Sequence, residues 1–197
     1  MTPFEYITVL ISIILGLGIT QIVTGVADII HQWNRVRIYW PHLLWIVLVF
    51  FLHIQEWWWL YELRTYEKWR LPIFLFVILY PINLFILARI LFPYGSDIVG
   101  TGNQTGKVDL KEFYFGNYRK FFLLIAVLAV LAVLDDVFIQ HYRIIDEAPQ
   151  LAILTLSTLI TTMKLGQEWI HRLFVVALVL MMLITFAVQW NEWLVGA

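Results

Sequence analysis

The sequence predicts an all-α protein, a polytopic bundle of about six transmembrane helices. Of its 197 residues, 61% are hydrophobic and only 14% are charged, whereas a soluble domain carries about 25% charged residues. The apolar residues also gather in runs of about 20, which is long enough to cross the hydrocarbon core of a bilayer at about 1.5 Å per residue. Lipid must therefore cover much of the surface, so we expect an integral membrane protein.

Six segments pass this length test, and the chain forms one membrane domain, 1–197. The expected spans are about 4–31, 41–63, 71–92, 118–141, 148–164 and 169–194. Pro41, Pro72 and Pro149 each lie near a predicted helix start, where a proline at the first helical position costs no hydrogen bond. Pro81 lies inside the third segment and should kink it. The longest loop is expected at about 93–117.

Charge and cysteine content exclude several classes of protein. A net charge of -1 leaves no basic surplus for nucleic acid, and the absence of cysteine excludes disulfides, thiolate metal sites and covalent haem attachment. The lysines and arginines favour one side of the membrane, which predicts a multi-pass protein with both termini outside. On the inner side we expect Arg35, Arg37, Arg89, Lys107, Lys111, Arg119, Lys120, Lys164 and Arg172. On the outer side we expect Arg64, Lys68, Arg70 and Arg143.

Two stretches resemble a known group of sequences. VLISIILGLGITQIVTG in the first segment and RVRIYWPHLLW after it resemble a family of uncharacterised bacterial inner-membrane proteins. The resemblance covers most of the chain and depends on apolar patterns. It implies a location in the bacterial inner membrane, and it implies no activity and no site residue.

A polar layer near the middle of the membrane is the sharpest functional signal. Its members are Gln21, His53, Glu56, Asn83, Ser157 and Thr158. His53 and Glu56 are three residues apart on one helix face, and ionisable residues inside a membrane often mark a path for protons or solutes. This predicts a channel or carrier for protons, cations or a small solute. Two alternatives are a buried polar pair that fixes helix register, and a tilted segment that brings Glu56 to the outer headgroups.

A second layer, nearer the inner surface, suggests a metal site. Asp28-x-x-His31 and Glu168-x-x-His171 each place a carboxylate and an imidazole on one face of a helix, with His42 at similar depth. Such pairs hold iron or manganese in some helix bundles. The opposing interpretation is an ordinary set of interfacial residues, with Glu168 satisfied by Lys164 and Arg172 at i-4 and i+4. No other cofactor is expected.

An outer layer includes Asp135 and Asp136, which point to different faces of the fourth segment because successive residues are about 100° apart. We expect them at a solvated helix end, with a cation vestibule as the alternative. Arg143 and Arg64 are the candidate partners for one of the two carboxylates.

The first segment carries a ridge of small residues, Ser12, Gly16, Thr20 and Thr24, which lets another helix approach closely. This predicts tight packing inside the bundle or across a homo-oligomer, with a solute-lining role as the alternative. A second stripe on the same helix consists of Gly18, Gln21, Gly25 and Asp28.

Three classes of function remain. The first is the channel or carrier, the second is a non-catalytic scaffold or partner subunit, and the third is a metal-dependent or lipid-modifying membrane enzyme. Hydrolase, nucleotide-binding and zinc-protease motifs are absent from the sequence, so catalysis has the least support. Permeation predicts a water-accessible cavity at Glu56. A scaffold predicts a dry core whose polar groups are satisfied internally.

Overall fold

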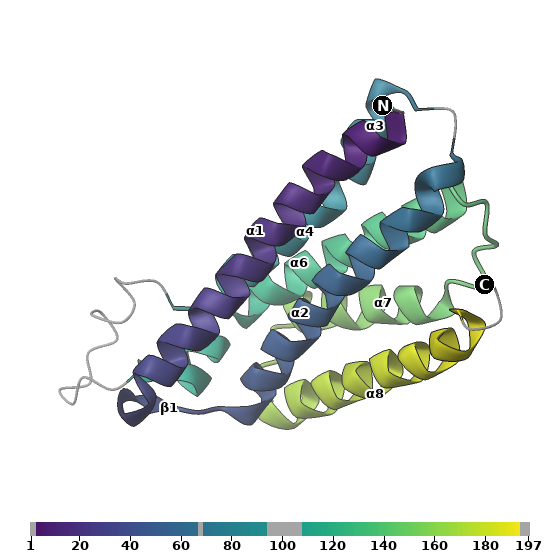
Figure 1. The fold of residues 1–197 in the computed structure, drawn as a ribbon. Helices are drawn as coiled ribbons and strands as arrows, with labels where there is room; N and C mark the ends of the chain where they lie inside the picture. The colour runs from purple at the N-terminus through teal and green to yellow at the C-terminus, as the bar shows by residue number, and fades with distance from the viewer. Residues whose placement is uncertain (1–2, 67–68, 94–107, 194–197) are drawn as a thin grey trace.

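The computed structural model describes residues 3–66, 69–93 and 108–193. Within them the chain forms an all-α bundle, as the sequence predicts (Figure 1). The helices are α1 (Pro3–His31), α2 (Trp40–Trp59), α3 (Leu71–Val77), α4 (Leu79–Ile90), α6 (Leu110–Phe138), α7 (Ala148–Thr162) and α8 (Glu168–Trp193). The shorter elements are η1 (Trp33–Arg35), β1 (Val36–Arg37), η2 (Leu60–Thr65) and β2 (Val108–Asp109).

Four stretches of helix are long and apolar enough to cross a membrane. They are Pro3–His31, Leu71–Ile90, Leu110–Phe138 and Glu168–Val188. α7 is shorter, at 15 residues. α2 has 20 residues and is not among those four. By the length and composition of its helices, the chain is an integral membrane protein.

Proline and a capping aspartate set several helix boundaries. Pro41, Pro72 and Pro149 lie in the first turns of α2, α3 and α7, as expected. The helix that contains Pro81, which is expected to be kinked, is interrupted at Ile78, between α3 and α4. The cause is the ring of Pro81, which clashes with the carbonyl four residues earlier and supplies no N–H to it.

α6 begins earlier than the fourth predicted segment, at Leu110. The carboxylate of Asp109 accepts hydrogen bonds from the backbone N–H groups of Lys111, at 2.8 Å, and Glu112, at 3.3 Å. Such a cap satisfies N–H groups that have no partner within the helix. The same residue anchors this end of the bundle, since β2 pairs in parallel with β1 and Arg37 lies 3.4 Å from the Asp109 carboxylate.

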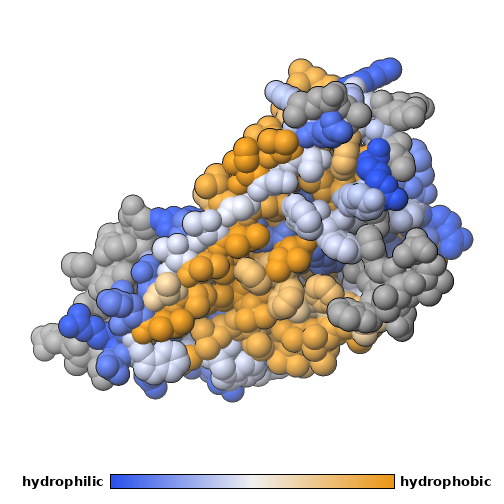
Figure 2. Space-filling view, in the orientation of Figure 1, coloured by the Kyte–Doolittle hydropathy of each residue, from blue (hydrophilic) through white to orange (hydrophobic). Residues whose placement is uncertain are grey.

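The close packing of α1 uses the second small-residue stripe. A methyl group on Gly18 would overlap the ring of His53 in α2, and one on Gly25 would overlap the ring of Phe92. Within the described chain nothing lies within 4 Å of the same position at Gly16, and Thr20 is exposed. The ridge from Ser12 to Thr24 thus faces away from its own bundle, along the pale band over α1 in Figure 2. Its predicted packing inside the bundle is wrong, and packing across a homo-oligomer stays a prediction.

We expect Gly18→Ala and Gly25→Ala each to lower the free energy of unfolding by about 1–3 kcal/mol, because the added methyl overfills a packed interface. Gly16→Ala should be neutral or stabilising by up to about 1 kcal/mol, because it only lowers the entropy cost of the helix. Thermal unfolding in detergent, followed by circular dichroism, measures all three. Equal effects at Gly16 and Gly18 would contradict this account of the packing.

Candidate functional site

His53 and Glu56 contact different neighbours in the structure. The ring of His53 is fully buried against Gly18, and its Nδ1–H donates a hydrogen bond to the Val49 carbonyl at 2.7 Å. Its Nε2 is buried without a hydrogen-bond partner among the described residues. Glu56 is only 8% exposed and lies close enough to Asp135 and Asp136 to interact with them electrostatically. No hydrogen bond or ion pair between described residues joins His53 to Glu56.

Glu56, Asp135 and Asp136 form what we call the carboxyl cluster, with Tyr80 of α4 within its electrostatic reach. Asp135 is also only 8% exposed, and its Oδ2 is buried with no hydrogen-bond partner in the described chain. The expectation that Asp135 lies at a solvated helix end is therefore wrong. It arose from counting depth from helix ends, although α6 has 29 residues and α2 has 20, so their ends need not lie at one level.

Neither Glu56 nor Asp135 forms an ion pair with a described residue. The four ion pairs of the described side chains lie elsewhere: Arg37–Asp109, Lys111–Glu168, Arg143–Asp146 and Arg172–Glu168. Arg143, expected near Asp135 or Asp136, instead lies 3.2 Å from Asp146. An unpaired buried carboxylate costs several kcal/mol, and neighbouring carboxylates repel each other. The cluster is therefore chemically suited to hold a proton.

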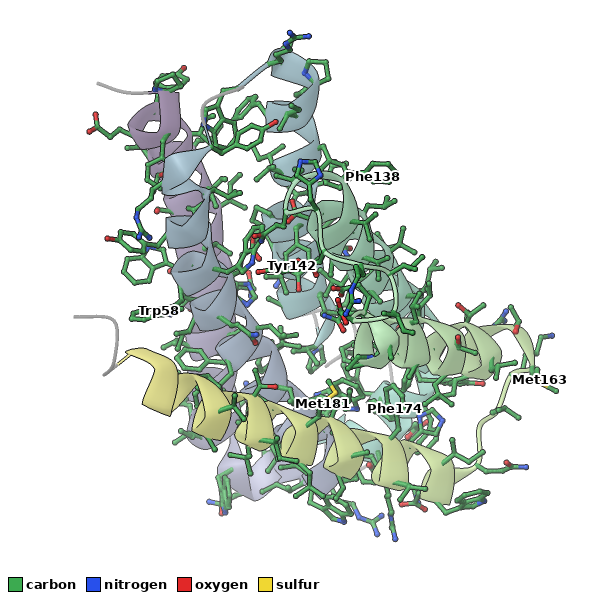
Figure 3. All side chains as sticks on the ribbon, turned by 90° about the vertical axis from the view of Figure 1, so that its right-hand side faces the viewer. Trp58, Phe138, Tyr142, Met163, Phe174 and Met181 are labelled. Atoms are coloured by element: carbon green, nitrogen blue, oxygen red, sulfur yellow. The ribbon has the colours of Figure 1, made fainter. Side chains whose placement is uncertain are left out.

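Figure 3 looks at the bundle from the side of the α6–α7 connection. In this view Tyr142 lies between the ribbons of α2 and α6, and about half of its side chain is exposed. The connection that carries Tyr142 begins directly after α6, whose last turn also holds the two aspartates of the cluster. This end of the bundle therefore gathers acidic and hydroxyl groups.

Two cavities of the described chain lie away from the carboxyl cluster. A small one of about 10 Å³ lies beside His42, lined also by Leu91 and Tyr114. A groove of about 300 Å³ lies between α1 and α2 and is lined only by apolar side chains. Neither is lined by Glu56, so neither is the water-accessible cavity that permeation predicts. A scaffold predicts a core in which every polar group has a hydrogen-bond partner. His53 and Asp135 each have a buried polar atom without one among the described residues, so that prediction is not met either.

The other residues of the predicted middle layer do not join His53 or Glu56 through hydrogen bonds. Asn83 is buried, and its Nδ2–H donates to the Leu124 carbonyl at 3.0 Å, which ties α4 to α6. Ser157 is fully buried with its hydroxyl unpartnered among the described residues. Thr158 is exposed and Gln21 is partly exposed. The middle layer is therefore not one site.

His171 belongs to a saturated hydrogen-bond network. Its Nε2–H donates to the Leu165 carbonyl at 2.8 Å, and its Nδ1 accepts from the Tyr114 hydroxyl at 2.9 Å. The ring is fully buried, with Tyr118 and Phe122 among the aromatic rings that contact it edge-on. With both ring nitrogens engaged, His171 presents no lone pair to a metal ion.

The remaining residues of the predicted metal site point elsewhere. Glu168 accepts from Arg172 at 2.5 Å, as expected, and from Lys111 at 2.8 Å in place of Lys164, because Lys164 lies beyond α7 with a φ of 51°. His42 donates from Nε2–H to the Leu91 carbonyl at 2.8 Å, just past the end of α4. Asp28 and His31 are exposed near the end of α1. Among the residues that the structure describes, no group of three or more potential ligands could hold a metal ion.

Tyr39 completes the polar contacts at this end of the bundle. Its side chain is buried just before α2. Burial, and then the negative charge of Glu168, raise the pKa of its hydroxyl above the ordinary value. Arg172 lies close enough to act in the opposite direction. The Tyr39 hydroxyl therefore stays neutral, and it is buried without a hydrogen-bond partner among the described residues.

Comparison with known proteins gives no further guide to the site. No protein-family model, no curated protein and no solved structure matches the chain. The carboxyl cluster is thus the strongest candidate on its own chemistry. Sequence reasoning named Glu56 as part of a site and missed its partner Asp135, although both are acidic residues in apolar helices.

We expect Tyr114→Phe to lower the free energy of unfolding by about 1–3 kcal/mol, because it leaves the buried Nδ1 of His171 without its donor. Tyr118→Phe is the matched control, since its ring contacts the same imidazole but its hydroxyl does not bond to it; the expected change is within about 0.5 kcal/mol. Denaturation in detergent compares the two. Equal losses would show that the hydrogen bond to His171 contributes nothing of its own.

Proposed function

We propose that this integral membrane protein takes up and releases protons at the carboxyl cluster, as a proton-coupled carrier or part of a proton path. The observation that carries the proposal is the pair Glu56 and Asp135. Both are nine-tenths buried, lie near each other, and have no ion-pair partner among the described residues. Ionisable residues inside a membrane domain are costly and generally serve function.

Proton exchange follows from the electrostatics of the cluster. Ionised carboxyl groups at this site lack hydration and repel each other. Binding a proton therefore lowers the free energy of the cluster. Releasing that proton becomes favourable when water or a cation reaches the carboxylates. The cluster could therefore couple proton release to the entry of another species.

The path from water to the carboxyl cluster is shorter from one side of the membrane. Glu56 is three residues from the end of α2, and Asp135 is three residues from the end of α6, a rise of about 4.5 Å along each helix. In the other direction α2 continues through His53 into the run from Leu43 to Leu52, which contains only apolar side chains. This apolar barrier favours a carrier that changes conformation rather than a permanently open channel.

The proposed orientation places both termini outside and the carboxyl cluster nearer the outer surface. It is supported by Arg35, Arg37, Lys111 and Arg172, which lie at the opposite end of the bundle, around β1 and β2. Positive residues favour the inner side of a membrane. We propose the bacterial inner membrane as the location.

A partner subunit or membrane scaffold is the second candidate. The ridge from Ser12 to Thr24 supports it, because its small residues face away from the bundle and could admit a helix of another copy or another protein. A metal-dependent enzyme gains no support from the described residues, since His171 is saturated and Glu168 is paired.

Proton flux in proteoliposomes tests the proposed function. With an imposed pH gradient and sodium, potassium or choline salts, we expect the parent protein to raise proton flux above that of empty liposomes. Glu56→Gln and Asp135→Asn should each reduce the flux at least about tenfold, because an amide cannot exchange the proton. Asp146→Asn should leave it unchanged, since Asp146 is exposed and pairs with Arg143.

Two results would contradict the proposal. Flux no greater than in empty liposomes, across pH and with all three salts, would remove its proton-conducting form. Equal flux in the parent and in folded Glu56→Gln and Asp135→Asn proteins would place any proton pathway outside the carboxyl cluster.

A further inference from the structure

The groove between α1 and α2 is not used by the proposed proton site. It has a volume of about 300 Å³. Its lining residues are Ile22, Val23, Val26, Ile46, Val47, Phe50 and Phe51. Ile22 and Ile46 are buried and form the floor, whereas Val23 is 55% exposed and Val47 is 44% exposed, at the rim. The groove therefore opens onto the surface that faces lipid.

The packing of α1 explains why the groove exists. At Gly18 the two helices are in close contact, because the ring of His53 occupies the space where a side chain would lie. Two turns further along, Gly25 packs against Phe92, just past α4, and not against α2. α1 is thus held against α2 at one point and against the end of α4 at the next. Val23 lies between these points and Val26 directly after the second, and their short side chains leave space beside α2.

The groove has a closed end and a charged end. Phe50 and Phe51 lie toward the contact between Gly18 and His53, and Phe51 also stacks edge-on against Phe186 of α8 at 5.6 Å between ring centroids. In the other direction, Val26 is five residues from the end of α1, which is about 7.5 Å along the helix.

The connection after α1 carries Arg35 and Arg37, both exposed. Hydrophilic residues gather at this end in the space-filling view (Figure 2). Arg37 keeps 80% of its side chain exposed while it pairs with Asp109. The two guanidinium groups therefore lie where the α1–α2 hairpin leaves the apolar part of the bundle.

We propose that the groove binds one acyl chain of an anionic phospholipid, with its phosphate held by Arg35 and Arg37. An apolar groove in the lipid-facing surface takes hydrocarbon, and its volume is in the range of small-molecule binding sites. Basic residues at the inner membrane surface favour anionic headgroups. A second copy of the chain is the less favoured occupant, because a symmetric contact along this groove would bring the arginines of both copies together.

Native mass spectrometry of the detergent-solubilised full chain tests the proposal, with dioleoyl phosphatidylglycerol and dioleoyl phosphatidylcholine as separate probes. We expect the parent to retain one phosphatidylglycerol in preference to phosphatidylcholine. Val23→Trp and Val47→Trp should reduce retention of both lipids, because the indole occupies the mouth of the groove. Ile13→Trp is the matched control, since Ile13 is 55% exposed on α1, as Val23 is, but lies outside the groove.

The arginines give a second, independent test that leaves the groove itself intact. Arg35→Gln and Arg37→Gln should each weaken phosphatidylglycerol binding by about fivefold and leave phosphatidylcholine binding unchanged. Arg143→Gln, at the opposite end of the bundle, should change neither lipid. Circular dichroism of each variant establishes that it is folded.

Three results would overturn the proposal. The first is no preference of the parent for phosphatidylglycerol. The second is equal retention by Val23→Trp, Val47→Trp and Ile13→Trp. The third is efficient disulfide cross-linking of Val23→Cys in membranes, which the absence of other cysteines makes interpretable and which would assign the groove to a second copy.

Discussion

The burial of carboxyl groups without a paired cation is the constraint on which the rest of this structure depends. Glu56 and Asp135 come from helices that start beside the same β1–β2 pair and meet again at the other end of the bundle. An apolar interior cannot hold two unpaired carboxylates at low cost, so protonation of one of them lowers the free energy of the folded protein. The helix interruption at Ile78 lies two residues before Tyr80, whose hydroxyl is within electrostatic reach of the cluster. Asn83 of the same helix donates a hydrogen bond to α6.

Ion pairs and the His171 network satisfy many polar groups at the β1–β2 end, although the Tyr39 hydroxyl and the Nδ1 of His42 are buried there without a hydrogen-bond partner among the described residues. At the β1–β2 end, His171 uses both ring nitrogens, Glu168 accepts from two cations and Arg37 pairs with Asp109. Near the other end, Asp135 keeps a buried oxygen without a partner, and deeper in the bundle His53 keeps a buried nitrogen without one, among the described residues. The ion pairs of Glu168 and Arg37 fix the geometry of the β1–β2 end, whereas Glu56 and Asp135 form no ion pair with a described residue. The lipid proposed at the α1–α2 groove would add to the fixed end.

The sequence predicted the elements of the fold better than their contacts. Prolines located helix starts and the interruption before Pro81, because a proline acts through the local backbone. Apolar run lengths located the helices, because the thickness of a bilayer sets the length of a spanning helix. The sequence did not show which stripe of α1 packs inside the bundle, since lipid is as apolar as the protein interior and hydrophobicity does not tell one face from the other. The three-residue spacing of His53 and Glu56 likewise does not show whether the two side chains contact the same neighbour. It turns the helix by about 300°, so the side chains point about 60° apart, and α2 has neighbours in both directions.

Infrared spectroscopy of the protein in lipid measures the protonation of the carboxyl cluster most directly. The proposed mechanism predicts a C=O stretching band of a protonated carboxyl group at neutral pH, present in the parent and in Asp146→Asn. That band should be lost or shifted in Glu56→Gln and in Asp135→Asn. A spectrum of the parent without this band, or the same band in all three variants, would contradict a proton held by Glu56 or Asp135.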